Sequence, residues 1–426
     1  MSEDSPGNPS QTARGLGHRG RPAALGFVYA AILMNVLSMG IIIPVFPTLL
    51  REVSHTNDAQ AAIIAGYFGA AWSLMQLIFA PWFGAISDRF GRRPVLLVSM
   101  FGLAFDYVIM ALAPNLMWLF IGRVISGITA ASGAAAGAYV ADVSSPEDRA
   151  RNFGRFQAAA NAGIVLGPAI GGLVGSLDPR APFWLAAILA FANGLYGLFA
   201  VPESLSHERR APFRWASANA VGSIRLLLSY KGLMGLAAIV FLSQFASMAF
   251  NSIFQFYTHY RFGWGPREIG ILLMVLGLGN MLVQSTLAGY TSRKIGDRGA
   301  VIAGLVVSVG GFLVLGLAPG PAIFWAGTVV LCFAGVSFPA NMSLMTKRVG
   351  ADEQGRLQGA LSIFLGLTGL VGPVLFTNIF AWSIGPGAAL HLPGLPILVG
   401  AGLMVLALIA GYVFAREPET PPEPLP

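Results

Sequence analysis

The sequence of 426 residues predicts an all-α integral membrane protein, built from twelve transmembrane helices in two parallel six-helix repeats. Three observations lead to this fold class. Hydrophobic residues make up 55% of the chain and charged residues only 11%, which leaves too little polar surface for a soluble globule of this size. The apolar residues form runs of roughly twenty, the length of a helix that crosses the hydrocarbon core. A basic loop of ten residues also occurs twice, which indicates an internal duplication.

The apolar runs place the helices in order along the chain. A tail over 1–21 precedes an N-terminal bundle over 22–201, a linker over 202–231 joins it to a C-terminal bundle over 232–415, and a second tail covers 416–426. The composition of both tails predicts no packed core. The linker predicts an amphipathic helix from Trp215 to Tyr230 on the membrane surface. The predicted transmembrane helices span 23–50, 61–86, 94–113, 116–141, 152–176, 182–201, 232–258, 267–289, 299–318, 321–345, 357–382 and 393–415.

The distribution of positive charge predicts the orientation. With both termini in the cytoplasm, all Lys and Arg residues lie on the cytoplasmic side except Arg51, Arg123, Arg180, Arg261 and Arg267. This bias follows the positive-inside rule. The net charge of +7 is therefore a topology signal, and the basic residues are too dispersed to predict a nucleic-acid partner. The lipid bilayer is the expected partner. The first 21 residues lack the apolar core of a signal peptide, so the first helix is expected to direct its own insertion.

The duplication has a constant spacing. The loop Gly84–Arg93, with the sequence GAISDRFGRR, returns in degraded form as GYTSRKIGDR from Gly289, 205 residues later. The dipeptide Gly-Pro at 167–168 returns at 372–373 with the same spacing. Since each repeat contains an even number of helices, both halves have the same orientation, and such parallel repeats can rock about a cavity between them.

The first copy of the loop is a candidate gate. Asp88 and Arg92 are four residues apart, a spacing that allows an ion pair if the loop continues as a helix. Arg93 is interpreted mainly as a topology signal, because exposed charges contribute little energy. The candidate gate residues are Gly84, Asp88, Gly91, Arg92, Arg93 and Asp142.

Asp106 is the one acidic residue well within a predicted helix. An uncompensated charge at such depth costs at least about 2.5 kcal/mol. Helical rise puts Asp106 and Arg123 at nearly the same depth, roughly 18 Å from one surface and 10 Å from the other. Two interpretations stay open: a static ion pair, or a proton-coupling site tuned by burial and by the arginine. Histidine is not expected to take that role, because His18, His55, His207, His259 and His391 fall in tails, loops or helix ends.

The predicted fifth helix has a surface without side chains. Glycines at 163, 167, 171 and 175 recur every four residues, which lets another helix approach closely. Pro168 within this surface removes a helical hydrogen bond and predicts a kink. The candidate motif residues are Gly163, Gly167, Pro168, Gly171 and Gly172.

Polar side chains on helical faces suggest a substrate cavity. Gln244, Asn251 and Gln255 share one face of the predicted seventh helix, and Asn280 and Gln284 share one face of the eighth. Such amides either bind a ligand or hydrogen-bond neighbouring helices. Phe and Met residues among them suit a broad apolar drug. The candidate cavity residues are Asn35, Ser38, Gln76, Asn161, Gln244, Asn251, Gln255, Asn280, Gln284, Ser308 and Asn341.

These motifs resemble those of the major facilitator superfamily. GAISDRFGRRP resembles its loop signature, LFIGRVISG at 119–127 its fourth-helix motif, and GIVLGPAIGG at 163–172 the fifth-helix motif of its antiporters. Within this superfamily the sequence is most similar to that of the tetracycline-type drug:proton exporters. The segments that carry this similarity are FAPW (79–82), Asp106-Tyr107, RVISGIT (123–129), YVAD (139–142) and 149–172.

The resemblance implies a bacterial inner-membrane carrier that exports an amphipathic drug in exchange for protons. It implies a functional monomer, with no cofactor or metal beyond the proton gradient. It further implies that Asp88 meets the N-terminal end of a helix in the other half when the carrier faces outward, and that the glycine-rich helix seals the outer half.

Two positions depart from the tetracycline exporters. Alignment places Asn35 and Ser308 where those proteins have acidic residues in the first and ninth helices. A metal-chelated tetracycline cation needs negative or oxygen-rich surroundings, so that cargo or its usual coupling is in question. The alternatives are a symporter or exporter of a small metabolite, and a non-transporting membrane receptor. An enzyme is not expected, because the sequence shows no catalytic nucleophile, metal cluster or phosphate loop.

Overall fold

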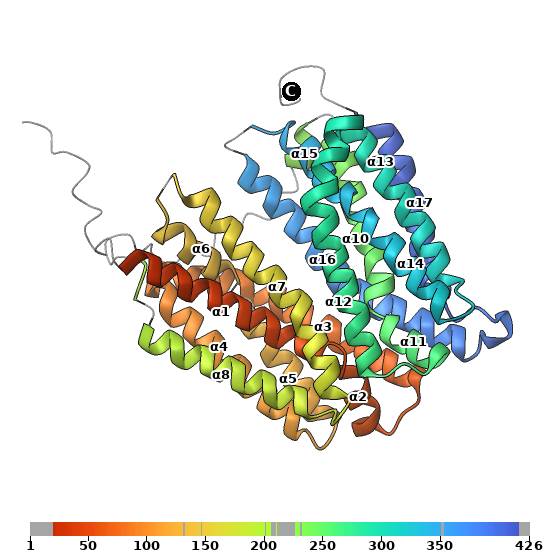
Figure 1. The fold of residues 1–426 in the computed structure, drawn as a ribbon, viewed down its shortest axis with the longest axis horizontal. Coiled ribbons are helices and arrows are strands. Elements are labelled where there is room, and N and C mark those ends of the chain that lie inside the picture. Colours follow the sequence, from red (N-terminus) through yellow and green to blue (C-terminus); the bar gives the residue numbers. More distant parts are fainter. Residues whose placement is uncertain are drawn as a thin grey trace, which may run out of the picture.

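The computed structural model describes residues 20–130, 133–145, 147–200, 202–205, 210, 226–230, 232–350 and 353–416. All regular secondary structure in these residues is helical, as predicted (Figure 1). The predicted tails lie almost entirely outside the described residues, and so does most of the predicted amphipathic helix between Trp215 and Tyr230.

The helices form two bundles that follow each other along the chain. The N-terminal half contains α1 (Gly20–Ile42), α2 (Phe46–Ser54), α3 (Asp58–Phe90), α4 (Arg92–Leu112), α5 (Leu116–Thr129), α6 (Gly133–Val143), α7 (Arg149–Gly175) and α8 (Ala181–Ala200). The C-terminal half contains α10 (Leu233–Asn251), α11 (Phe254–Phe262), α12 (Pro266–Leu282), the π-helix η5 (Val283–Leu287), α13 (Ala288–Gly316), α14 (Pro321–Phe333), η6 (Ala334–Val336), α15 (Ser337–Thr346), α16 (Gln354–Ile384), η7 (Ala388–Leu390) and α17 (Leu395–Phe414).

These elements account for twelve membrane crossings. Nine helical stretches of the described chain are long and apolar enough to span a membrane, and α1 with α2, bent by 45°, adds a tenth. One of the nine, Pro266–Gly316, has 51 residues and turns at Gly296, where φ is 74°, so it crosses twice. The consecutive helices α5 and α6 supply the remaining crossing.

Several helices differ from the predicted ranges in length or continuity. The predicted helix 61–86 extends over Asp58–Phe90, because the Asn57 side chain accepts a hydrogen bond from the Gln60 amide at 3.0 Å and caps a polar first turn. Hydrophobicity marks only the lipid-embedded part of such a helix. The predicted helices 23–50 and 232–258 are each divided into two, whereas the predicted helix 116–141 includes residues 131–132, which lie outside the described residues. Their breaks change which polar side chains share a face.

The two bundles meet at one end of the molecule and diverge towards the other (Figure 1). The end with the loops at Gly91 and Gly296 is called here the loop end, and the opposite end, with Asp58 and His259, the far end. Two helix pairs join the halves: α7 packs on α12, and α3 packs on α16. These pairs hold equivalent places in the two repeats, since Pro168 of α7 and Pro373 of α16 are 205 residues apart.

Close backbone approach defines both of these contacts. A Cβ atom on Gly270 of α12 would lie 2.5 Å from the Pro168 carbonyl oxygen, and one on Gly66 of α3 would lie 2.9 Å from the Pro373 carbonyl oxygen. Any side chain at either glycine would push the helices apart. Each half therefore presents one glycine to the motif proline of the other half.

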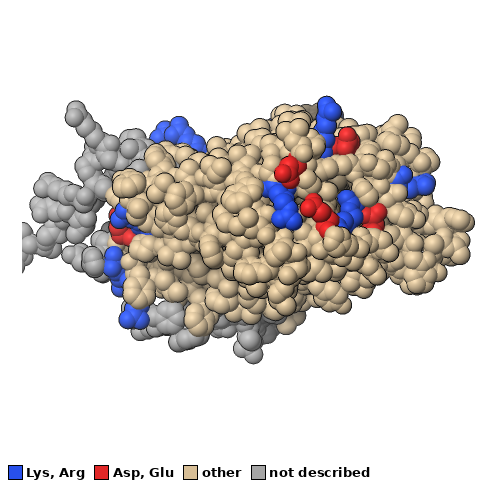
Figure 2. Space-filling view, turned by 90° about the horizontal axis from the view of Figure 1, so that it is seen from below, with Lys and Arg blue, Asp and Glu red and all other residues tan. Residues whose placement is uncertain are grey.

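The outer surface of the bundles suits lipid. Large apolar side chains are exposed along the helices, including Phe105 at 61%, Ile188 at 63% and Val98 at 62%. Figure 2 shows one face of the molecule, in which uncharged residues cover most of the surface and charged residues gather in small areas. Such apolar exposure is unfavourable in water and favourable in hydrocarbon.

The glycine surface of α7 packs on α1 of its own half. A Cβ atom on Gly163 would lie 2.9 Å from the Leu33 carbonyl oxygen, and one on Gly167 would lie 2.8 Å from the Gly40 Cα atom. A Cβ atom on Gly171 would clash with the Ile41 carbonyl. The contact between the halves uses a different face of α7, which carries the Pro168 carbonyl and Gly172.

We predict that Gly171→Ala destabilises the N-terminal half by about 1–3 kcal/mol, because a methyl group against the α1 backbone cannot be accommodated by rotating a side chain. The thermal unfolding midpoint of the purified protein in detergent measures this effect. Gly154→Ala on the same helix is the control, since nothing lies within 4 Å of its Cβ position and alanine favours helix. Equal midpoints for the two variants would contradict the close α1–α7 contact.

Candidate functional site

A cavity of about 400 Å³ lies between the two halves. Its wall in the N-terminal half comes from α1 to α5 and includes Phe46, Trp72 and Arg123. Its wall in the C-terminal half comes from α10, α11 and α16 and includes Asn251 and Gln255. This inter-half cavity has the volume of a small-molecule site and a mainly apolar lining.

Asp106 on α4 lies next to this cavity without lining it. Its side chain is fully buried, and neither carboxylate oxygen has a hydrogen-bond partner in the described part of the chain. A Cβ atom on Gly122 of α5 would lie 2.7 Å from Asp106 Oδ1, so the carboxylate packs against the backbone beside Arg123. An ionised carboxylate without partners is costly in such surroundings. The site therefore suits the protonated, uncharged form of Asp106.

Arg123 on α5 faces the inter-half cavity. Its guanidinium carbon lies 4.2 Å from the centre of the Phe46 ring, a cation–π contact. No ion pair joins Arg123 to Asp106 among the described residues, so the structure does not contain the static pair that was one of the two interpretations. Arg123 Nε and the Tyr107 hydroxyl are both buried without a partner in the part that the structure describes. Both residues line the cavity and can donate hydrogen bonds to a ligand or to water.

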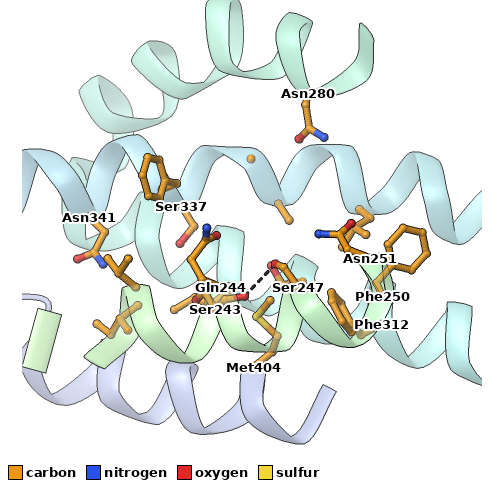
Figure 3. A pocket seen from close by; sticks show the side chains of 18 of the residues that line it. Ser243, Gln244, Ser247, Phe250, Asn251, Asn280, Phe312, Ser337, Asn341 and Met404 are labelled. Carbon is orange, nitrogen blue, oxygen red and sulfur yellow. Dashed lines mark hydrogen bonds between the residues drawn. The ribbon is translucent and has the colours of Figure 1, made fainter. Parts of the chain in front are cut away.

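A second cavity of about 280 Å³, called here the C-half chamber, lies among α10, α12, α13, α14 and α15 (Figure 3). Gln244 and Asn280 point into it from different helices. Asn251 lines both the chamber and the inter-half cavity. Its polar lining consists of four carboxamides and four hydroxyls: Gln244, Asn251, Asn280, Asn341, Ser243, Ser247, Ser308 and Ser337.

The structure places the predicted cavity residues of the C-terminal half in two different cavities. Because the chain leaves helical geometry between α10 and α11, Gln255 faces the inter-half cavity and Gln244 the C-half chamber. The π-helix at Val283–Leu287 changes the helical register, so Asn280 lines the chamber whereas Gln284 is exposed and lines neither cavity. Ser308 and Asn341 line the chamber.

The predicted residues of the N-terminal half do not gather in one place. Asn35 lines a small pocket with Ser99 among α1, α4 and α6, and Ser38 is buried and bonds the Met34 carbonyl oxygen at 2.7 Å. Gln76 and Asn161 line none of the three described cavities. The expectation of one continuous polar lining is therefore wrong for these four residues, because the polar atoms of a helix face often bond within the bundle.

The signature loop forms a compact ion network at the loop end. Gly91 ends α3 with φ of 109°, and the chain turns there into α4. Arg92 Nη1 donates to Asp88 Oδ1 at 2.5 Å, and Arg92 Nε donates to Asp142 Oδ2 at 3.3 Å. Arg93 also has a structural contact, since its Nη2 donates to the Leu198 carbonyl oxygen at 2.5 Å. Gly84 lies on α3 one helical turn before Asp88, and its Cβ position has open space around it.

Glu203, after α8, completes this loop and was missed by sequence reasoning. Its carboxylate accepts hydrogen bonds from the Arg92 amide at 2.8 Å and the Arg93 amide at 3.2 Å. It therefore caps the N-terminus of α4 across the bundle, where a negative charge is favourable. A Cβ atom at Gly91 would clash with Glu203. The position of the capping carboxylate therefore depends on a glycine with positive φ at position 91.

The copy of the loop in the C-terminal half keeps the geometry with the charges exchanged. Asp297 and Lys347 occupy the positions 205 residues after Arg92 and Asp142, and Lys347 Nζ lies 2.8 Å from Asp297 Oδ2. Gly296, which matches Gly91, also has a positive φ. The sequence had identified this copy as degraded, but its ion pair and its glycine turn are retained.

The far end holds a contact between the halves that involves a histidine. His259 Nδ1 of α11 lies 3.0 Å from Asp58 Oδ2 of α3, and Arg51 of α2 donates to Asp58 Oδ1 at 2.6 Å. Nearby, a Cβ atom on Gly172 would lie 2.5 Å from the Pro266 carbonyl oxygen of the other half. At the loop end, the ion pairs of the signature loop and of its copy each join residues of the same half. The structure therefore has the far end closed.

Comparison with known proteins identifies relatives over nearly the whole chain. The model of the Major Facilitator Superfamily matches residues 28–373 and again residues 236–426. The chain is 37% identical over 390 residues to the tetracycline resistance protein, class C, of Escherichia coli, which covers 91% of this chain and 96% of that protein. It is 35% identical over 355 residues to the class B protein of Escherichia coli, with 83% and 87% covered. It is 26% identical over 402 residues to multidrug resistance protein 2 of Bacillus subtilis (strain 168), with 89% and 94% covered.

Solved structures with the same fold are more distant in sequence. A mutant form of the nucleoside transporter NupG superimposes with a TM-score of 0.72 at 13% identity, covering 92% of this chain and all of that chain at 100%. The human organic anion transporter MFSD10 (TETRAN) gives a TM-score of 0.66 at 23% identity, with 92% and 99% covered. These likenesses support the twelve-helix fold alone.

We predict that Glu203→Gln loosens the signature loop, because the amide accepts more weakly than the carboxylate and loses the charge at the start of α4. Hydrogen exchange by mass spectrometry should show roughly tenfold faster exchange in the peptide that contains the Arg92 and Arg93 amides. Glu147→Gln, at an exposed loop position, is the control. Unchanged protection in Glu203→Gln would contradict the capping role.

We predict that His259→Leu weakens closure of the far end, because Asp58 loses its partner across the halves. In a Cys332→Ser background, a cysteine placed at Ser73 in the inter-half cavity should react about two- to fivefold faster with an impermeant maleimide added from that end. The exposed His391 supplies the control variant His391→Asn. Equal reaction rates in both variants would show that the pair does not hold the far end closed.

Proposed function

Because this chain belongs to the Major Facilitator Superfamily, and is thus a transporter and not an enzyme, we propose that it exports an amphipathic drug in exchange for protons. The observation that carries the proton part is Asp106, a buried carboxyl without partners beside the inter-half cavity. The drug class is suggested by the relatives that are named for tetracycline and multidrug resistance. A protein of this kind needs no cofactor other than the proton gradient.

The orientation follows from the positive-inside rule, and we place the loop end with its Arg and Lys residues in the cytoplasm. The described conformation then faces inward, with the far end closed on the opposite side of the membrane. Alternating access requires the α7–α12 and α3–α16 contacts to open at the far end while the loop end closes. The Asp88 side chain, 51% exposed, is available to meet a helix N-terminus of the C-terminal half in that second state.

Proton and cargo binding are coupled through neighbouring residues on α4 and α5. Asp106 precedes Tyr107, which lines the cavity, and packs at Gly122, which precedes the cavity-lining Arg123. A ligand that bonds Tyr107 or Arg123 changes the electrostatic surroundings of Asp106 and thereby links occupation of the cavity to the protonation of that carboxyl. Protonation in the outward-facing state then restores the neutral form that the described surroundings suit. Cargo binding and protonation of Asp106 are therefore coupled as an exchange, because each of them favours the state of the carrier that the other one leaves.

We predict that Asp106→Asn abolishes transport driven by a pH gradient and leaves membrane insertion intact, because asparagine cannot bind and release the proton. Uptake into proteoliposomes with an imposed gradient measures this transport. The drug for the assay is identified from the drug susceptibility of a pump-deleted host that expresses either the wild type or the variant. Asp178→Asn, at an exposed loop position, is the control. Unchanged pH-driven transport in Asp106→Asn would rule out Asp106 as the coupling site.

A further inference from the structure

We infer that the cargo of this transporter is an uncharged or anionic molecule without a bound metal, and that its hydroxyl and carbonyl edge occupies the C-half chamber. This inference rests on the proposed function and restricts the class of cargo that the protein would export. It concerns the charge class of the cargo and the place where its polar edge binds.

The chamber offers hydrogen bonds without charge. Its polar lining contains only carboxamides and hydroxyls, and none of its described lining residues is ionisable in the physiological range. The side chains of Gln244, Asn251 and Asn280 make no hydrogen bond to the described protein, so their donors and acceptors are available. Carboxamides offer both donors and acceptors, which matches a ligand edge of alternating hydroxyl and carbonyl groups.

Two buried atoms of the chamber lack partners. The Asn341 side chain is 2% exposed; its Nδ2 donates to the Leu236 carbonyl oxygen at 3.1 Å, while its Oδ1 has no partner in the described structure. Ser243 Oγ is likewise buried without a partner among the described residues. Leaving a buried polar atom unpaired costs roughly 1–3 kcal/mol. A ligand hydroxyl in the chamber would donate to Asn341 Oδ1 and remove part of that cost.

The inter-half cavity adds one charge, and it is positive. Among its described lining residues, Arg123 is the only ionised side chain. Asp106, which precedes the cavity-lining Tyr107, is fully buried outside both linings. A cation in the inter-half cavity would therefore meet the guanidinium without a carboxylate in the described lining, whereas an anionic or neutral cargo would not be repelled.

A metal chelate fits these linings poorly. Mg²⁺ in proteins is held through carboxylate oxygens, and no group of three or more His, Cys, Asp and Glu side chains in the described chain could hold a metal. Ser308, in the chamber, stands where the tetracycline exporters have an acid. The apolar remainder of the cargo has a place against Phe46, Trp72 and Phe256 in the inter-half cavity.

The test compares ligand charge with everything else held constant. The probes are tetracycline in EDTA, tetracycline as its cationic Mg²⁺ chelate, and a pair of xanthene dyes of equal ring size, one anionic and one cationic. Binding to the purified wild-type protein is measured by quenching of tryptophan fluorescence, and proton-driven uptake is measured in proteoliposomes. We expect metal-free tetracycline and the anionic dye to bind about five- to tenfold more tightly than their cationic counterparts. Tighter binding of the chelate or of the cationic dye, or equal binding of both members of each pair, would overturn the inference.

Two isosteric variants place the polar edge in the chamber. Gln244→Glu and Asn280→Asp add a negative charge with little change of shape, and each should reverse or abolish the preference for the anionic dye. Asn115→Asp is the matched control, because Asn115 is an exposed helix cap on α5 and aspartate caps equally well. Size-exclusion profiles check that each variant is folded. Because two independent positions are changed, the test still holds if one of the two variants does not fold. An unchanged preference in both folded variants would remove the chamber from the binding site.

The binding and uptake measurements separate the two proposals. If wild type binds the probes with the expected charge preference but takes none of them up with a pH gradient, the proposed export function fails and the cargo class stands. If wild type takes up the Mg²⁺ chelate in a proton-dependent manner with preference over metal-free tetracycline, the function stands and the inference fails.

Discussion

The close approach of two glycines to two proline carbonyls holds the halves of this protein together. Gly270 meets the Pro168 carbonyl and Gly66 meets the Pro373 carbonyl, and the two prolines are related by the internal duplication. The α3–α16 contact borders the inter-half cavity, because Gly66 and Pro373 line it, whereas Gly270 and Pro168 are not among its lining residues. Because both contacts are made at glycines, the two helices of each pair lie close together. In the proposed alternating access, these are the pairs at which the halves would move against each other.

The duplication explains which features of the loops are structural. Arg92 pairs with Asp142 in the first half and Asp297 pairs with Lys347 in the second, so the pair is kept while the signs are exchanged. The glycine with positive φ is kept as well. The first loop contains, in addition, the Asp88 carboxylate, which lies beside this pair and is largely exposed. The common geometry thus serves the turn between two helices, and the additional exposed acid, which is paired with Arg92, distinguishes the loop proposed as a gate.

Much of the fold follows from the sequence, because the length of apolar runs and the asymmetry of positive charge report directly on the bilayer. The twelve crossings, the repeat and the position of Asp106 beside the helix of Arg123 were accessible in this way. Glu203 was not, since its contact with the Arg92 amide joins residues 111 apart with no spacing rule. The π-helix that follows Asn280 was also hidden, because helical periodicity assumes an unbroken register. Sequence placed side chains on faces, but only the packed structure decides which faces enclose a cavity.

The arrangement of charge separates proton binding from cargo binding. If Asp106 lined the cavity, a cationic cargo could replace the proton directly at the carboxylate. It is instead buried behind the helix that carries Arg123, and the only charge in the described cavity lining is that guanidinium. In the proposed exchange, cargo acts on the proton through Arg123 and Tyr107, and a cationic group at that point would meet the guanidinium without a carboxylate among the described lining residues. Asn35 and Ser308, where the resemblance to the tetracycline exporters predicts acids, are uncharged, which agrees with the proposal that the cargo binds through neutral amides.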